Sequence, residues 1–231
     1  MYSGKWIAST FLNFVFIAIF YSSFAQELVS FPDSMYQNHR WQTFVKLEKL
    51  ADTIDYRTID YPLLNAAVFF LTNREREKHG QIPFVFSPAL RDMADFHSQE
   101  MAKHEFVDHT NLRNFKYSTV GKRSKQFNAN ALAENVASAF LYHYESGSQF
   151  YRSWNGSDFD FFTQENELIR KHTYLSFAES LVQNWMDSQP HRASILHPSL
   201  RKMGCAVRVG ENDMKKGYIP MGYGTQNFSD F

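Results

Sequence analysis

Two stretches, Ala133-Glu134-Asn135-Val136 and Trp185-Met186-Asp187-Ser188-Gln189-Pro190-His191-Arg192, decide how the fold and its site are interpreted. With Phe106-Val107-Asp108-His109-Thr110 upstream, they place two histidines and one glutamate in segments that are otherwise mostly apolar. A carboxylate in apolar surroundings is costly unless it is paired or hydrogen-bonded. We therefore predict that His109, Glu134 and His191 meet in the folded protein and line one shared pocket.

The N-terminus has the pattern of an export signal, predicted over residues 1–25. Lys5 precedes a mostly apolar stretch, and small residues before Gln26 place the cleavage there. An uncleaved membrane anchor is the alternative, because the apolar stretch is just long enough to span a bilayer. We expect a cleaved signal and no stable membrane anchor after cleavage. The protein is then secreted or extracytoplasmic, either extracellular or periplasmic.

Composition narrows the class of protein further. Lys plus Arg equals Asp plus Glu at 24 each, so no net field attracts nucleic acid, and we expect no nucleic-acid partner. The 23 Phe and 12 Tyr predict a bulky core and an aromatic-lined cavity. A single cysteine, Cys205, excludes an intramolecular disulfide, and its apolar neighbours indicate a small buried residue rather than a nucleophile.

Residues 26–60 are predicted to form an N-terminal extension with a short amphipathic helix, because Trp41, Phe44 and Leu47 recur near helical spacing. The main domain is predicted over residues 61–231. Within it, residues at about 141–172 are rich in Tyr, Phe, Ser and Gly. This composition indicates an irregular insertion, which is either a lid or a flexible excursion.

Capping residues mark the expected helices. An N-cap with proline in the first turn occurs twice. The predicted helices run from Asp60 to Gly80, from Ser87 to about Lys103, and over the segment that ends at Ser188. Residues 112–130 are predicted as a polar loop, and Leu132 to Phe140 as a short helix that carries Glu134. A hairpin over Cys205–Val209 and Tyr218–Phe228 closes the chain, which gives an α+β domain whose helices cover a mostly antiparallel sheet.

Common catalytic motifs are missing from the sequence. The histidines in His104-Glu105-Phe106-Val107-Asp108-His109 are five residues apart, whereas a zinc-protease helix needs them four apart. The sequence also has no Gly-x-Ser-x-Gly elbow and no phosphate-binding glycine loop. Dispersed histidines and a carboxylate can hold Zn²⁺, with His109 and His191 as weak candidates. A buried hydrogen-bond network around them is the alternative, and His97, on an apolar helix stripe, is more typical of a core residue.

The ordered motifs resemble the CAP superfamily of cysteine-rich secretory proteins, venom antigens and pathogenesis-related plant proteins, and most closely its bacterial extracellular members. The resemblance covers most of residues 61–228. It is carried by Leu71-x-Asn73-x-x-Arg76-x-x-x-Gly80, Ala94-x-x-His97-Ser98-x-x-Met101, Phe106-x-x-His109-Thr110, Ala133-Glu134-Asn135-Val136, Trp185-x-x-Ser188-x-x-His191-Arg192 and Gly222-Tyr223-Gly224-Thr225-Gln226. It implies a three-layer α-β-α sandwich with a central cleft.

Two departures from the animal members concern the cleft. There, two histidines and two glutamates form a tetrad, which His109 and Glu134 match in part. Ser188 stands at the second glutamate position and Tyr223 at the second histidine position, whereas His191 resembles the bacterial pocket histidine. The resemblance thus implies a cleft of His97, His109, Glu134, His191 and Tyr223 without an intact metal tetrad, so no cofactor is expected and zinc stays an alternative.

Three functions are compatible with these residues. We expect a secreted binding module that holds a small apolar or amphipathic ligand, such as a lipid or sterol, in the cleft. A hydrolase or peptidase, with His109 as general base and Glu134 as its orienting acid, is the first alternative. The second is a structural or interaction domain at the cell surface, in which the pocket contributes only stability.

Overall fold

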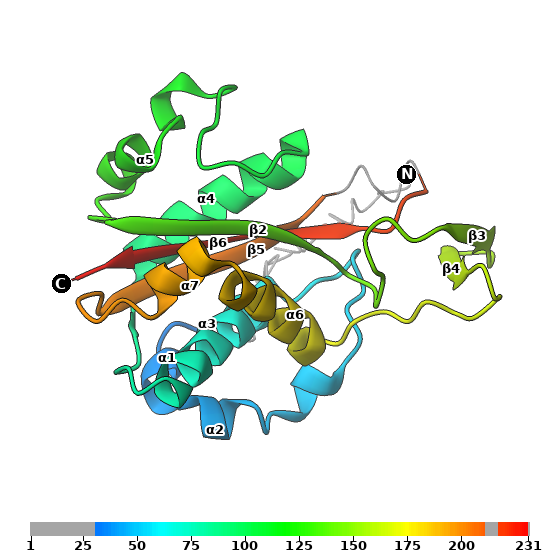
Figure 1. The fold of residues 1–231 in the computed structure, drawn as a ribbon, viewed down its shortest axis with the longest axis horizontal. Helices are drawn as coiled ribbons and strands as arrows, with labels where there is room; N and C mark the ends of the chain where they lie inside the picture. Colours follow the sequence, from blue (N-terminus) through cyan, green and yellow to red (C-terminus); the bar gives the residue numbers. More distant parts are fainter. Residues whose placement is uncertain (1–30, 211–216, 231) are drawn as a thin grey trace, which may run out of the picture.

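The computed structural model describes residues 31–210 and 217–230 (Figure 1). The predicted export signal over residues 1–25 lies outside the described residues, as do residues 211–216 between the two predicted strands of the closing hairpin. A four-stranded sheet has the order β1-β5-β6-β2. Its strands are β1 (Val85–Phe86), β2 (Ala133–Phe140), β5 (Lys202–Val209) and β6 (Met221–Ser229). β1 is parallel to β5 and the other neighbours are antiparallel, which confirms the predicted mostly antiparallel sheet.

Helices cover both faces of this sheet (Figure 1). On one face lie α4 (Pro88–His104) and α5 (Val120–Phe127), and on the other α3 (Tyr61–Lys78), α6 (Tyr174–Asp187) and α7 (Gln189–Ile195). The alternation of β6 fits this arrangement. Ser98 of α4 donates to Thr225 at 2.9 Å, whereas the adjacent Gln226 donates to Thr72 of α3 at 2.7 Å. No helix of the described residues is long and apolar enough to cross a membrane.

Side-chain caps begin the three long helices, and two of these caps were predicted. The Asp60 carboxylate accepts a hydrogen bond from Leu63 N at 3.1 Å, and the Ser87 hydroxyl accepts one from Leu90 N at 3.4 Å. Thr173, for which no cap was predicted, begins α6 by accepting from Ser176 N at 3.1 Å. Each oxygen satisfies a backbone donor that has no partner within its own helix, so the sequence signals and the observed starts agree at Asp60 and Ser87.

The prediction of a helix over Leu132 to Phe140 is wrong, because these residues form strand β2. All eight residues of β2 pair with β6, from Ala133 opposite Phe228 to Phe140 opposite Met221. Alanine and glutamate are good helix formers, but intrinsic propensity is a small effect, and pairing with a strand about 90 residues later overrides it.

Three shorter segments also differ from expectation. Residues 112–130, predicted as a loop, contain the 3₁₀ turn η2 (Phe115–Tyr117) and helix α5. The extension holds three short pieces rather than one amphipathic helix, and α7 follows α6 directly. The pieces of the extension are α1 (Met35–Asn38), α2 (Trp41–Phe44) and η1 (Glu48–Ala51).

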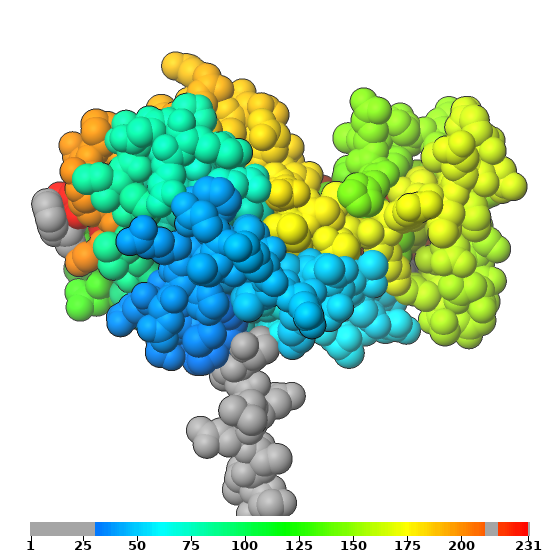
Figure 2. All heavy atoms as spheres, turned by 90° about the horizontal axis from the view of Figure 1, so that it is seen from below, coloured from blue at the N-terminus to red at the C-terminus, as the bar shows by residue number. Residues whose placement is uncertain are grey.

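The segment predicted as an irregular insertion contains an ordered hairpin. Strands β3 (Phe150–Trp154) and β4 (Phe159–Thr163) pair antiparallel over five residue pairs. Figure 2 shows this hairpin, in yellow-green, standing off from the body of the molecule. The chain leaves the sheet after β2 and returns to begin α6, so the hairpin is an arm attached at one end of the sandwich.

Arg76 cross-links the core although it carries a charge. Its fully buried guanidinium donates to four backbone carbonyls: Ile82 O at 2.7 Å, Ile195 O at 2.5 Å, His197 O at 3.2 Å and Leu200 O at 3.3 Å. It also stacks on Phe84, 3.9 Å from the ring centroid. Burial lowers the pKa of Arg76 to about 10, so the side chain stays protonated at neutral pH. One side chain thus joins α3 to the segments before β1 and before β5.

Gly204 marks the closest approach of the sheet to α4, and its replacement is a sharp test of the packing. A Cβ at this position lies 2.0 Å from Arg91 N, a backbone atom that cannot move aside alone. We expect Gly204→Ala to lower the free energy of unfolding by about 2–3 kcal/mol. Gly121→Ala in α5 is the control, because nothing lies within 4 Å of its Cβ and alanine favours the helix. Denaturant unfolding of both variants measures the difference, and equal stability would contradict this packing.

Candidate functional site

The candidate site is built around Glu134, near the start of strand β2. In the register of the sheet, Glu134 lies opposite Asn227 of β6. Its side chain is only 1% exposed. An isolated carboxylate in such a place strongly favours its neutral form, so its partners decide what it can do.

Arg123 is the main partner of Glu134. The Nη2 atom of this fully buried side chain donates to Glu134 Oε1 at 2.8 Å and to Oε2 at 2.9 Å. It also donates to His109 O at 2.9 Å, while Nη1 donates to Tyr117 O at 3.0 Å. Helix α5 places the guanidinium there because Arg123 shares one helix face with Val120 and Phe127. The pair therefore ties α5 and the loop after α4 to the sheet.

Asn227 completes the surroundings of the carboxylate. With its amide oriented so that both polar atoms have partners, Nδ2 donates to Glu134 Oε2 at 3.1 Å and the oxygen accepts from Ala94 N at 3.1 Å. Both carboxylate oxygens are therefore bonded within the protein. Glu134 acts as the junction of α4, α5, β2 and β6.

His109 is the exposed member of the cluster. Its Nδ1 lies 3.0 Å from Glu134 Oε1, and 49% of the side chain is accessible to solvent. The hydrogen bond to Glu134 raises the pKa of His109, with burial opposing the shift. The predicted meeting of His109 and Glu134 is therefore seen in the structure, with the imidazole at the protein surface.

His97 lies beneath His109 and is fully buried. Its Nε2 donates to Asp108 O at 2.8 Å and is 4.0 Å from Glu134 Oε1. Burial lowers the pKa of His97, which favours the neutral imidazole. Its Nδ1 has no hydrogen-bond partner among the described residues. His97 thus orients the loop that carries His109 and has no access to solvent.

His191 and Tyr223 lie around the Glu134 cluster rather than in it. His191 lies in α7, on the other face of the sheet. Its backbone carbonyl accepts a hydrogen bond from Asn135 Nδ2 at 3.1 Å. Burial lowers the pKa of His191, and the nearby charge of His109 lowers it further, so the two imidazoles are electrostatic neighbours. Tyr223 is buried against Met101 and neighbouring apolar side chains farther along β6.

Two residues of the cluster, Arg123 and Asn227, were not among the sequence-based candidates. Asn227 sits in the motif after Gly224 but only the register with Glu134 gives it a role. Arg123 was within a predicted loop. A signal did exist, since Thr119 is an N-cap and Val120, Arg123 and Phe127 follow helical spacing.

The donor set does not fit a divalent metal. Both oxygens of Glu134 face the Arg123 guanidinium, whose positive charge repels a second cation, and His109 Nδ1 is bonded to the same carboxylate. Within residues 31–210 and 217–230, no three His, Cys, Asp or Glu side chains are grouped to hold a metal ion. The geometry instead forms a rigid, charge-balanced platform beneath one accessible imidazole.

Comparison with protein families identifies the family of the chain that carries this site. The cysteine-rich secretory protein family, CAP, matches residues 69–228. This chain belongs to the CAP family. The matched region begins within α3 and includes the whole Glu134 cluster, the sheet and the hairpin arm. A comparison with curated proteins found no match.

Three solved structures similar to this CAP protein come from bacteria. An extracellular protein containing an SCP domain from Bacillus anthracis has 18% identity and a TM-score of 0.48, with 74% of this chain and 42% of that chain covered. An outer surface protein from Borrelia burgdorferi has 11% identity and a TM-score of 0.45, with 77% and 97% covered. A cysteine-rich secretory protein from Staphylococcus aureus has 12% identity and a TM-score of 0.42, with 73% and 38% covered. The chain thus spans less than half the length of the first and third of these.

Removing the charge of Glu134 tests the platform. Glu134→Gln leaves the Arg123 guanidinium buried without a counter-charge, so we expect the free energy of unfolding to fall by about 3 kcal/mol or more. Glu179→Gln is the matched control, because Glu179 accepts from Arg74 at 2.8 Å with its side chain 44% exposed. That surface pair should contribute less than about 1 kcal/mol. Urea denaturation compares the two, and a similar small loss in both variants would argue against the buried pair.

The histidine titrations give a second, independent test. Because Glu134 stabilises the imidazolium of His109, its pKa lies above 6.5, whereas those of His97 and His191 lie below it. The stabilisation that His109 adds is therefore present below about pH 6.5 and is lost as the pH rises through its folded pKa. NMR of the imidazole resonances should show this order in the unaltered protein and a lower midpoint for His109 in Glu134→Gln. Titration of His109 below His191 would refute the arrangement.

Proposed function

We propose that this protein is an extracytoplasmic binding module that holds a small apolar or amphipathic ligand at the surface above His109. The observation that carries the proposal is the full engagement of Glu134 by Arg123, His109 and Asn227. A carboxylate held in this way has a structural role, and it orients the exposed imidazole of His109. Such a group suits recognition of a polar headgroup.

Exposed apolar side chains near His109 support an apolar or amphipathic ligand. Val107 is 44% exposed, Leu112 is 90% exposed and Phe115 is 84% exposed, all in the loop that carries His109. Leu132, two residues before Glu134, is 58% exposed. Large apolar side chains that gather on one exposed segment are typical of interaction sites. We call His109 and these four side chains the His109 rim.

The hydrolase alternative has weaker support. A general base must be neutral to accept a proton, whereas Glu134 holds His109 in its protonated form to higher pH. No hydrogen bond joins His109 to a hydroxyl or thiol among the described residues. The lone thiol, Cys205, is 2% exposed, and burial raises its pKa well above the ordinary value. A domain without any ligand is the third candidate, and only binding experiments separate it from the first.

An extracytoplasmic location is part of the same proposal. Its support is the predicted export signal before Gln26, together with similar structures of an extracellular protein and an outer surface protein. Because the chain has a single cysteine, it forms no intramolecular disulfide and needs no oxidising compartment to fold.

A binding titration with N-phenyl-1-naphthylamine, a neutral apolar fluorophore, tests the rim. We expect saturable binding to the exported, purified protein and a loss of affinity of about tenfold in Phe115→Ser, because the ring supplies the largest exposed apolar face of the rim. Ile82→Ser is the control, since Ile82 is 62% exposed outside the rim.

The same proteins decide between the three functions. Native mass spectrometry and organic extraction should recover a lipid-like ligand from the unaltered protein and less of it from Phe115→Ser. Ester or peptide hydrolysis that disappears in His109→Ala would favour the enzyme. Equal probe binding by all variants, with nothing extracted, would favour a domain without a ligand.

A further inference from the structure

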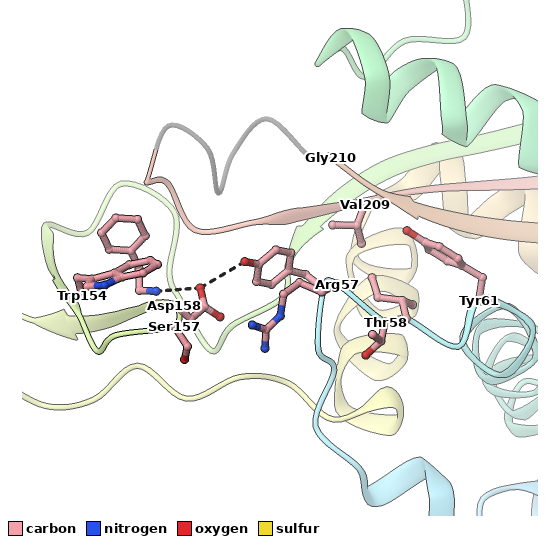
Figure 3. Close-up of a pocket in the computed structure, with 11 residues that line it drawn as sticks. Arg57, Thr58, Tyr61, Trp154, Ser157, Asp158, Val209 and Gly210 are labelled. Atoms are coloured by element: carbon pink, nitrogen blue, oxygen red, sulfur yellow. Dashed lines mark hydrogen bonds between the residues drawn. The ribbon is translucent and has the colours of Figure 1, made fainter.

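A cavity at the other end of the sheet lies between the hairpin arm and the body (Figure 3). It has a volume of about 580 Å³ and is lined by residues 56–59, Tyr61, the turn between β3 and β4, and the end of β5. Val209 of its wall pairs with Gly222, whereas Glu134 pairs with Asn227. Five residues along β6 separate these positions by roughly 17 Å. The cavity is therefore distinct from the His109 rim.

Aromatic rings form much of the cavity wall. Tyr56 and Tyr61 contribute from the body, and Trp154 and Phe159 contribute from the arm. The Trp154 indole is 58% exposed, and Phe159 packs against it at 5.1 Å between ring centroids, inclined by 69°. Arg208 lies over the Tyr61 ring at 4.3 Å. Flat rings held in place by neighbours provide surfaces on which a planar or ring-shaped ligand can stack.

The charged side chains of this wall already have oppositely charged partners within the protein. Asp158, from the arm, accepts from Phe159 N at 2.8 Å and from the Tyr56 hydroxyl at 3.4 Å, and it pairs with Lys171 at 3.3 Å. Figure 3 draws the bond that crosses from arm to body. Arg57 is bonded to Asp55 at 2.9 and 2.8 Å. Because neither charge needs a counter-ion, the site favours a neutral ligand that offers hydroxyl groups.

A second cavity of about 620 Å³ adjoins the first, and Tyr61 and Val209 line both. Gln99, Glu100 and Lys103 of α4 contribute polar groups to the walls of this second cavity. An alkyl chain long enough to reach both cavities would meet an aromatic wall in the first and a polar wall in the second. A chain of sugar rings meets both walls well, since each ring has an apolar face and a polar edge.

We infer that this cavity binds a neutral oligosaccharide, with one sugar ring stacked on Trp154 and hydroxyl groups directed to Asp158, Ser157 and Thr58. Its size falls in the range of small-ligand sites, about 300–1,000 Å³. Residues 56–59 of one wall belong to the N-terminal extension, which precedes the region that matches the CAP family. The extension and the arm together create this site.

Isothermal titration calorimetry of the exported, purified protein with chitotriose, cellotriose and maltotriose tests the inference. We expect saturable binding of at least one trisaccharide below about 10 mM and an affinity about tenfold lower in Trp154→Ala, the loss of one stacked ring. Tyr151→Ala is the matched control. Tyr151 is a 42% exposed aromatic residue of the same hairpin, stacked on Phe162 and outside the cavity wall, so its variant should bind like the unaltered protein.

Three outcomes would overturn the inference: no binding of any trisaccharide, equal weakening in Trp154→Ala and Tyr151→Ala, or binding of N-phenyl-1-naphthylamine alone that depends on Trp154. The last outcome would make the cavity a lipid site. Saturation-transfer NMR on the unaltered protein gives a readout that needs no variant to fold. Phe115→Ser should leave trisaccharide binding unchanged, so failure here and failure of the His109 rim are distinguishable.

Discussion

Two opposite charges that lie out of contact with solvent, Arg123 and Glu134, are the constraint on which one end of this molecule depends. Each charge alone would be too costly to bury, and together they are tolerated only with well-placed hydrogen bonds. Those bonds recruit the loop after α4, helix α5 and Asn227 of the central strand β6. The position of His109 is a result of this arrangement, because its backbone oxygen and its ring are both held by members of the pair. The exposed imidazole is therefore fixed by groups that solvent does not reach.

The two ends of the sheet use different physical means to present a surface. At the Glu134 end, buried polar groups are satisfied internally, and a loop with exposed apolar side chains covers them. At the Val209 end, the hairpin arm and the extension leave a hollow that aromatic rings line. The first surface belongs to segments within the CAP match, while the second needs residues that precede it. A single sandwich thus supports two surfaces of different chemistry without a change in its core.

The sequence predicted features that local chemistry determines and missed those that distant partners determine. The caps at Asp60 and Ser87 were predicted from a few neighbouring residues, and the helices begin there. The cost of a bare carboxylate led to the prediction that Glu134 meets both His109 and His191, and the structure joins it to His109 while His191 lies outside the cluster. The strand state of β2 depends on pairing with β6, which local propensity cannot indicate. Arg123 was overlooked because a short polar helix resembles a loop, and the cavity beside the arm depends on three segments far apart in the sequence.

Arg76 has a consequence for the conditions under which this fold persists. Covalent sulfur links join distant loops only where the surroundings oxidise thiols, and reductants open them. Here one guanidinium joins the segments before β1 and before β5 through their carbonyl oxygens. These hydrogen bonds depend on the protonation of the Arg76 guanidinium and on the exclusion of water, and neither of these responds to electron transfer. Thiol reductants, which dismantle disulfide-rich secreted proteins, therefore leave this cross-link intact.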